Sequence, residues 1–400
     1  MEAVISGNIR PGFEAVREAF AQNFEKYHEV GASVAVVRNG QYLVDLWGGW
    51  ADEERTRPWE ADTIVNVWST TKGFVSLGAH MLIDRGQLEL DKPVADYWPE
   101  FAQAGKGEIT VRQLMSHRAG LAGWAEPVTE DLMYDWAKLC EMLAAQEPFW
   151  EPDTQSGYHA LTFAHLVGEL VRRIDGRPIE EFIREEITDP LKADMFIGVQ
   201  PEDDHRVADL CTTLDAPPPQ NPSQVKSEPE ETEADAGEGS ASEVSQLMLR
   251  ALGNPFVGPK VANSTAWRRG VFPSANGHGN ARGIAATYGT IAAGGTFGKI
   301  QMFTPEVIER MREEQPTGRD LVISADGEEM TWGTGYMVNK QKWYGPNPRA
   351  LHHGGYGGSL GFCDPETGIG FGYAMNAMNV STLVKDKRAV VLLKAVYKSL

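Results

Sequence analysis

Apolar side chains recur at helical spacing close to the start of the chain. After Pro11-Gly12 they stand at Phe13, Val16, Phe20 and Phe24. Residues three or four positions apart share one face of an α-helix, so this spacing predicts a helix with an apolar stripe. We expect the stripe to pack on a flat surface.

Strand-like runs form a pair near each end of the chain. The runs ASVAVVR (32–38) and QYLVDLWGG (41–49) flank Asn39-Gly40, and both turn residues tolerate positive φ, which favours a tight β-hairpin. Near the other end, SLGFC (359–363) and IGFGYAM (369–375) flank the turn-forming sequence DPETG. The sequence therefore predicts two hairpins that are far apart in the chain.

Helical periodicity dominates between the hairpins and returns after the second one. One apolar face, which ends at Gly176 and Pro178, consists of Leu166, Val167, Leu170, Val171 and Ile174. Near the C-terminus, Ser381 is a candidate N-cap for a final helix with an apolar side made of Val384, Val391, Leu392 and Val396.

Together these elements predict an α+β fold with two lobes. An antiparallel sheet built from both chain ends and flanked by helices would take up residues 1–85 and 275–400. A mostly helical inserted lobe would take up residues 86–274. A cleft between two lobes is a common place for a site.

Residues 215–244 differ from the rest of the helical lobe in composition. They are rich in Pro, Glu, Ser and Gly and nearly free of apolar side chains, so burial cannot offset the entropy of ordering them. We expect a long acidic surface loop. A segment that folds over the mouth of a cleft is the alternative, which composition favours less.

Composition and charge exclude several classes of function. The chain has 400 residues, 42% hydrophobic and 23% charged, with a formal net charge of -19, which disfavours nucleic acid and anionic membranes as partners. No basic patch with interleaved aromatics and no apolar run of membrane-spanning length is present. The N-terminal stretch lacks the order of a signal peptide, so we expect a cytoplasmic protein. The sequence leaves the oligomeric state open.

The three cysteines, Cys140, Cys211 and Cys363, are far apart and none forms a Cys-x-x-Cys pair. A disulfide framework and a zinc cluster are therefore both disfavoured, and buried free thiols are expected.

The stretch VWSTTKGF (67–74) carries the first candidate chemistry. Ser69 stands three residues before Lys72, so the two side chains share a face if a helix begins here. A serine hydroxyl needs a base to act as a nucleophile, and burial would lower the pKa of a lysine and free its lone pair. An ordinary capping serine is the alternative explanation of the same pattern.

Two further stretches could complete a site. Tyr158, in Gly157-Tyr158-His159-Ala160, could relay a proton, or it could be a core tyrosine. The stretch LHHGGYGGSLGF (351–362) contains glycines that let backbone approach a ligand and offer amide donors to an oxyanion, or it could be a simple turn. His352 and His353 are adjacent in a strand and point to opposite faces, so they do not form a metal site.

In this order, the three elements resemble the serine β-lactamase and penicillin-binding-protein family. Ser69-Thr70-Thr71-Lys72 resembles its first box, Tyr158-His159-Ala160 its second and His353-Gly354-Gly355 its third. The flanking stretches GQLELDKPVADYWPEF (86–101), ITVRQLMSHRAGL (109–121) and NGHGNARGIAATYGTIAAGG (276–295) are similar to the carboxylesterase branch called family VIII. The resemblance covers most of the chain.

The resemblance implies a serine carboxylesterase that acts on a small-molecule ester without a metal or organic cofactor. Ser69 would be the nucleophile, and Lys72 and Tyr158 would move protons. The backbone amides of Ser69 and Tyr356 would hold the oxyanion, and the pocket would be lined by His353, Gly354 and Gly355. Class C β-lactamases have asparagine at Ala160 and lysine at His353, so the departures favour the esterase branch.

Other functions remain open at this point. A β-lactamase, a D-aminopeptidase or an acyltransferase could use the same nucleophile, and a non-catalytic binding or scaffold protein could have the same fold. Gly357-Gly358-Ser359-Leu360-Gly361 matches the nucleophile elbow of α/β-hydrolases, but a strand and hairpin follow it, so Ser359 is expected to be structural. Tryptophans that could wall a pocket or fill the core are Trp68, Trp124, Trp136, Trp150, Trp267, Trp332 and Trp343.

Overall fold

A computed structural model describes residues 3–212, 238–316, 318–324, 329–379 and 385–400. Its main sheet has seven strands in the order β1-β3-β2-β13-β12-β11-β10, and all neighbours are antiparallel. The strands are β1 (Ile5–Ile9), β2 (Gly31–Arg38), β3 (Gln41–Gly49), β10 (Met337–Val338), β11 (Leu351–Gly354), β12 (Leu360–Asp364) and β13 (Ile369–Met375). The predicted α+β fold, with a sheet built from both chain ends, is confirmed.

Both predicted hairpins are present. Asn39 and Gly40 have φ of 50° and 71°, the left-handed values that a two-residue turn between β2 and β3 requires. The second hairpin joins β12 to β13. β13 then pairs with β2, where Tyr373 lies opposite Val34, and this pairing joins the two ends of the chain.

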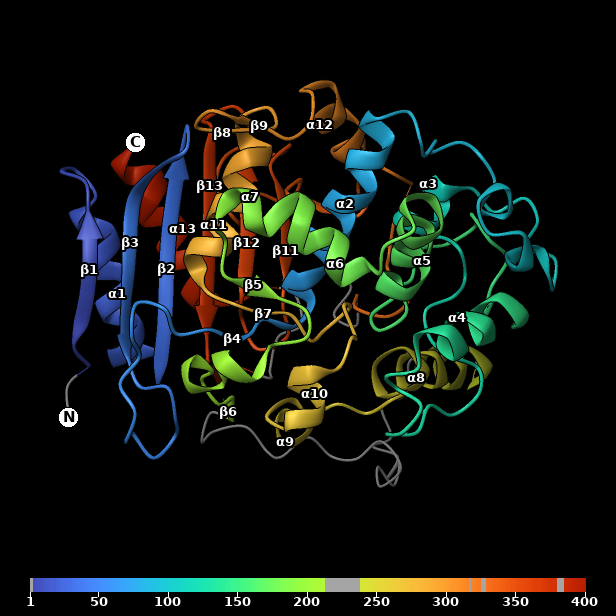
Figure 1. The fold of residues 1–400 in the computed structure, drawn as a ribbon, viewed down its shortest axis with the longest axis horizontal. Helices are drawn as coiled ribbons and strands as arrows, with labels where there is room; N and C mark the ends of the chain where they lie inside the picture. Colours follow the sequence, from blue (N-terminus) through green and yellow to red (C-terminus); the bar gives the residue numbers. More distant parts are fainter. Residues whose placement is uncertain (1–2, 213–237, 317, 325–328, 380–384) are drawn as a thin grey trace.

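Helices cover both faces of the sheet (Figure 1). The predicted N-terminal helix is α1 (Glu14–Lys26), which packs with α13 (Lys387–Ser399) against one face. The other face is covered by α11 (Ala281–Ala292), which packs on β2, β12 and β13.

Glycines and larger side chains alternate along β13, which explains how closely α11 packs on the sheet. A Cβ on Gly370 would lie 2.1 Å from the Gly289 nitrogen, and a Cβ on Gly372 would lie 2.3 Å from the Ala281 oxygen. The glycines therefore allow a close approach of helix and sheet, while Tyr373 points to the opposite face.

The predicted start of the final helix is wrong. The side chain of Asp386, not of Ser381, caps α13. An aspartate directly before the helix satisfies its free N–H groups as well as a serine does, and composition gave no way to choose between them. Ser381 and Val384 lie outside the described residues. Two of the predicted apolar positions, Leu392 and Val396, are buried.

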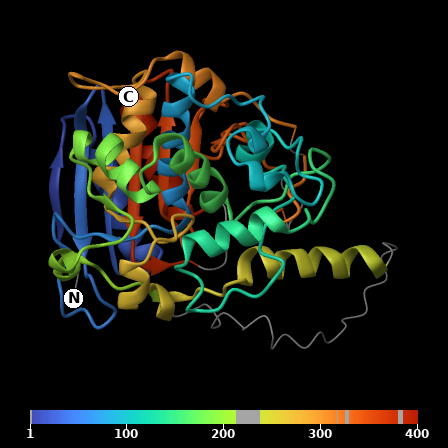
Figure 2. The same cartoon turned by 45° about the vertical axis from the view of Figure 1, so that its right-hand side comes forward.

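Several helices pack around α2 (Lys72–Asp84), which is almost entirely buried and contacts α5 (Phe163–Asp175). α5 is the helix predicted from apolar spacing, and Gly176 ends it with φ of 94°. The other α-helices are α3 (Val111–Met115), α4 (Trp136–Ala145), α6 (Ile179–Ile183), α7 (Asp189–Leu191), α8 (Glu238–Gly253), α9 (Pro259–Ala262), α10 (Thr265–Arg269) and α12 (Glu306–Met311). Figure 2 shows α4 and α8 on the side of the molecule away from β1.

The predicted loop at 215–244 needs a correction at its end. α8 begins at Glu238, so residues 238–244 are helical, whereas residues 215–237 lie outside the described residues. The prediction averaged composition over the whole segment and overlooked the helical spacing of Leu247 and Ala251, which follow it. The division of the chain into lobes at 85/86 and 274/275 stays a prediction.

Short elements complete the fold. The tight helical turns are η1 (Trp68–Thr71), η2 (Val94–Asp96), η3 (Pro99–Ala102) and η5 (Pro201–Arg206), and η4 (Arg184–Thr188) is a π-helix. The small strands are β4 (Val65–Asn66), β5 (Met195–Phe196), β6 (Cys211–Thr212), β7 (His278–Gly279), β8 (Thr296–Phe297), β9 (Ile300–Gln301) and β14 (Ala377–Met378). Cys140, Cys211 and Cys363 are buried free thiols, as predicted. No helix in the described part of the chain is long and apolar enough to cross a membrane.

Candidate active site

Ser69 lies in the tight turn η1, directly before α2 begins at Lys72. Neither the turn nor the helix has a side-chain cap, so the capping explanation of Ser69 does not hold. Val67 anchors this segment, because its N–H donates to the Gly277 carbonyl oxygen at 2.8 Å. The serine is therefore held on a rigid turn beside the first residue of a buried helix.

Lys72 reaches back to the serine. Its Nζ donates to Ser69 Oγ at 2.8 Å and to the Ser274 carbonyl oxygen at 2.7 Å. The side chain is fully buried and forms no ion pair with a described carboxylate, and burial lowers the pKa of Lys72 well below its usual value. A neutral amine in this position can take the Ser69 proton. Sequence reasoning missed Ser274, which orients the amine through its backbone oxygen.

Tyr158 joins the same cluster. Its ring centroid lies 5.0 Å from Lys72 Nζ, and its side chain is close enough to Ser69 for that hydroxyl to lower its pKa. Burial, and then the charge of Asp320, raise the pKa of Tyr158, while the interaction with Ser69 opposes them. The phenol is therefore protonated at neutral pH and can donate a proton. The structure brings the three predicted residues together.

Aromatic rings hold the Tyr158 ring on two sides. Trp332 stacks on it with a centroid distance of 5.5 Å and an interplanar angle of 11°. His117 meets it edge-on at 5.1 Å. The sequence alone did not show which tryptophans wall a pocket and which fill the core. In the structure, Trp332 and Trp68 lie at the site, whereas Trp124 and Trp267 are core residues.

His117 also fixes the backbone around Tyr158. Its carbonyl oxygen accepts from the Gly157 N–H at 3.0 Å, and its Nδ1 accepts from the His159 N–H at 3.1 Å. His117 has a φ of 62°, which an ordinary residue adopts only when its surroundings impose it. The flanking stretch 109–121 contained this histidine, but no local pattern showed that it contacts the second box.

The third box passes close to the serine. A Cβ on Gly355 would lie 2.2 Å from the Val67 carbonyl oxygen, so glycine is required there. The chain then turns, with the Gly358 N–H donating to the Gly355 oxygen at 3.0 Å and with Gly357 at a φ of 90°, as in a type II turn. Tyr356 is the second residue of this turn, and its ring packs edge-on against Trp68 at 5.5 Å.

His352 and His353 point to opposite faces, as predicted. The His353 ring lies 6.2 Å from the Tyr158 ring, whereas His352 packs on Tyr344 at 4.9 Å. The Nδ1 of His353 lies 2.9 Å from the Gly354 carbonyl oxygen and therefore carries the proton. Burial, with a smaller contribution from Lys72, lowers the pKa of His353 to about 3, so the site has a neutral ring here.

Ser359 is a structural residue by its contacts. It is buried, and its Oγ donates to the Val67 carbonyl oxygen at 2.7 Å and lies 3.0 Å from Thr70 Oγ1. It leads into β12 of an antiparallel sheet, whereas a nucleophile elbow needs a turn from a strand into a helix. The α/β-hydrolase interpretation is therefore excluded.

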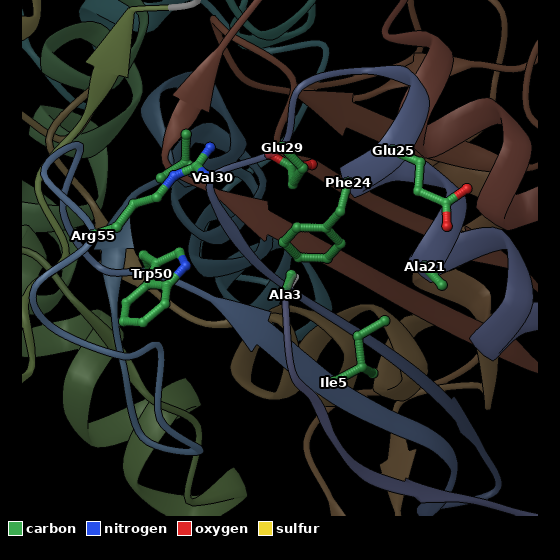
Figure 3. Close-up of a pocket in the computed structure, with 9 residues that line it drawn as sticks. All are labelled: Ala3, Ile5, Ala21, Phe24, Glu25, Glu29, Val30, Trp50 and Arg55. Carbon is green, nitrogen blue, oxygen red and sulfur yellow. The ribbon is translucent and has the colours of Figure 1, made fainter. Parts of the chain in front are cut away.

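In the described ranges, no group of three or more His, Cys, Asp or Glu could hold a metal ion. A cavity of about 180 Å³ (Figure 3) lies between α1 and the start of the sheet. Its lining is Ala3, Ile5, Ala21, Phe24, Glu25, Glu29, Val30, Trp50 and Arg55, and none of these belongs to the Ser69 cluster.

The fold and the serine–lysine–tyrosine cluster define the class of β-lactamase-like serine hydrolases. The chain belongs to the Beta-lactamase family, whose family model matches residues 16–395. The chain is 33% identical over 405 residues to the esterase/beta-lactamase LipL of Mycobacterium tuberculosis, covering 96% of this chain and 86% of that protein.

Solved structures agree with this family. A family VIII carboxylesterase has 41% sequence identity and a TM-score of 0.89, and the match covers 99% of this chain and 100% of that one. A penicillin-binding-protein homologue from Caulobacter crescentus has 39% identity and a TM-score of 0.86, with the same coverage.

Proposed function

We propose that the protein is a carboxylesterase that hydrolyses small apolar or short-chain esters through an acyl-enzyme on Ser69. The observation that supports this most directly is the 2.8 Å contact between Ser69 Oγ and a buried Lys72 that no described carboxylate neutralises. The similarity to a family VIII carboxylesterase at 41% identity supports the ester as the substrate class.

Acylation begins when neutral Lys72 accepts the hydroxyl proton of Ser69 as Oγ attacks the ester carbonyl carbon. The carbonyl oxygen becomes an oxyanion, which the backbone N–H groups of Ser69 and Tyr356 stabilise. Removing one such donor typically costs about 2.7–4 kcal/mol of transition-state stabilisation. The C–O bond then breaks, and the leaving alkoxide takes a proton from Tyr158, which recovers one from Lys72.

Deacylation runs through the same groups. A water molecule attacks the acyl carbon while the Tyr158–Lys72 pair accepts its proton. The bond between the acyl carbon and Ser69 Oγ then breaks, and the pair returns the proton to Oγ, which restores the hydroxyl. His353, Gly354 and Gly355 line the pocket in this proposal. No step needs a metal or an organic cofactor.

Esters fit this site better than β-lactams do. A β-lactam brings a carboxylate, but the ring of His353 is neutral, because the pKa of this histidine is lowered to about 3. Ala160 offers a methyl group where an amide would hold the acylamino side chain, and one lost partner for such a buried polar group costs about 1–3 kcal/mol. An opened β-lactam also stays tethered and obstructs the incoming water.

A β-lactamase activity is the second candidate, because one relative is named an esterase/beta-lactamase. A D-aminopeptidase or an acyltransferase would use the same nucleophile, and acyl transfer would depend on an added acceptor alcohol. A non-catalytic scaffold is disfavoured because the cluster of Ser69, Lys72 and Tyr158 is intact. The cytoplasmic location stays a prediction.

The substrate class is tested by comparing two substrates on one preparation. We expect kcat/KM for a short-chain nitrophenyl ester to exceed that for a chromogenic cephalosporin, with slow acylation or a long-lived acyl-enzyme for the latter. Equal or better turnover of the cephalosporin would move the protein to the β-lactamase branch.

A further inference from the structure

A buried carboxylate lies directly behind the proposed proton relay. Asp320 is only 1% exposed, and its Oδ1 accepts from the Tyr158 N–H at 3.0 Å. The same oxygen accepts from the N–H groups of Val322 and Ile323 at 2.9 and 3.1 Å. Its Oδ2 accepts from Trp332 Nε1 at 3.2 Å. All four partners are N–H donors, which fits an ionised carboxylate.

These contacts bear on Tyr158 in two ways. Through Oδ1, Asp320 fixes the backbone of Tyr158. Through Oδ2, it fixes the indole of Trp332, which stacks on the Tyr158 ring at 5.5 Å. Both ends of one carboxylate therefore determine where the phenol lies.

We infer that Asp320 is a positioning residue of the esterase reaction, which holds Tyr158 and its stacking partner in place and supplies a fixed negative charge behind them. This inference rests on the proposed function. Nothing in the local sequence marks Asp320 as part of the site, because Tyr158, which it positions, lies 162 residues away in the chain.

The charge has a predictable consequence for proton transfer. The ionisable groups that pack against Tyr158 are Lys72, His117, His353 and Asp320, and burial disfavours the cationic forms of the first three. Burial raises the pKa of Asp320 as well, but its four N–H donors oppose that rise and stabilise the ionised carboxylate, so Asp320 is the fixed charge of the cluster. The charge of Asp320 raises the pKa of Tyr158, so removing that charge lowers the pH at which the phenol loses its proton.

The test uses Asp320→Asn, Trp332→Phe and, as a matched control, Glu169→Gln. Glu169 is also a buried carboxylate that accepts from an indole, Trp136 Nε1, at 2.8 Å, but it lies outside the Ser69 cluster. For each variant, kcat, KM, the pH profile of kcat/KM and the melting temperature are measured with the nitrophenyl ester.

We expect Asp320→Asn to lower kcat by about 100-fold with little change in KM, because a misplaced catalytic group costs rate. We also expect it to move the basic limb of the profile, where Tyr158 loses its proton, to lower pH. Trp332→Phe keeps the charge and most of the stacking, so it should lower kcat less and leave the limb in place. Glu169→Gln should lower the melting temperature without changing kcat or the limb.

The inference is overturned if Asp320→Asn has the kcat and the pH profile of the wild type. It is also overturned if Glu169→Gln lowers kcat as much as Asp320→Asn does. If Asp320→Asn fails to fold, Trp332→Phe decides, because an unchanged kcat there contradicts the role of the indole. Phosphonate labelling of wild-type Ser69 is done first. If it fails, the proposed function falls; if it succeeds and Asp320→Asn behaves as wild type, only the present inference falls.

Discussion

Two buried lysines of this protein have different surroundings, and the difference explains why one of them suits catalysis. Lys106 Nζ donates to the carbonyl oxygens of Gln103, Ala144 and Gln146, and burial lowers its pKa to about 8. Lys72 has one carbonyl partner and one hydroxyl partner, Ser69. All the hydrogen-bond partners of Lys106 are therefore backbone carbonyl oxygens, which have no proton to give. Lys72 instead has a hydroxyl partner, so its lone pair can accept the Ser69 proton when the amine is neutral.

We expect Lys72→Ala and Tyr158→Phe each to lower kcat by several orders of magnitude and the double variant to lose little more, because the two residues form one proton relay. Steady-state and single-turnover kinetics with a nitrophenyl ester provide the measurement. Lys106→Ala is the matched control, which should lower stability but leave acylation intact. Independent, additive losses would show that the pair does not act as a unit.

Ser359→Ala should reduce stability more than chemistry. The substitution removes the Ser359 donor from the buried Val67 carbonyl oxygen, which keeps the Thr70 N–H, so it should cost about 0.5–1.5 kcal/mol of the free energy of unfolding. Denaturant unfolding measures this loss, and the acyl-enzyme on Ser69 should still form. Complete loss of acylation in a folded variant would contradict the structural role.

At the scale of helices, strands and turns, the sequence predicts the elements that depend on residues close together in the chain. The turn at Asn39-Gly40 and the end of α5 at Gly176 depend on residues within the element itself. β1 (Ile5–Ile9) went unrecognised, because its short run with Gly7 gains its stability from pairing with the distant β3. The start of α8 was hidden by averaging composition over a longer segment.

A buried ionic cluster ties the connection between α1 and β2 to β13 and α13. Glu29 Oε1 accepts from Arg388 Nη1 at 2.9 Å, and its Oε2 contacts the Tyr373 hydroxyl. Arg388 also pairs with Asp386 at 3.0 Å, so one cation serves two carboxylates. Burial raises the pKa of Glu29 from its ordinary value of 4.5 to about 7, and Arg388 opposes this shift only partly.

This pKa predicts that the cluster loses stability as the pH rises. The folded protein keeps the Glu29 proton up to about pH 7, whereas the unfolded chain releases it near 4.5. The contribution is therefore complete below pH 4.5 and is lost as the pH passes through 7. Glu29→Gln imitates the protonated form, so its melting temperature relative to wild type should rise between pH 5 and pH 8. A constant difference across that range would contradict the assignment.

At the scale of the whole molecule, the site is built from segments of the sheet and of the helices and loops packed beside it. The serine turn, the Tyr158 loop, the backbone at Ser274, the third box and Asp320 are far apart in sequence. Motif spacing was enough to predict Ser69, Lys72, Tyr158 and the segment at 351–362. Ser274 acts through a backbone oxygen and Asp320 through long-range contacts, and neither leaves a local pattern. The catalytic roles of the predicted residues stay predictions.

The most direct test of the account is intact-protein and peptide mass spectrometry after reaction with an active-site phosphonate or a slow ester. The account predicts one adduct per chain, located on the peptide that contains Ser69, with no adduct on folded Ser69→Ala. An adduct on another serine such as Ser359, or ester turnover that survives in Ser69→Ala, would contradict it.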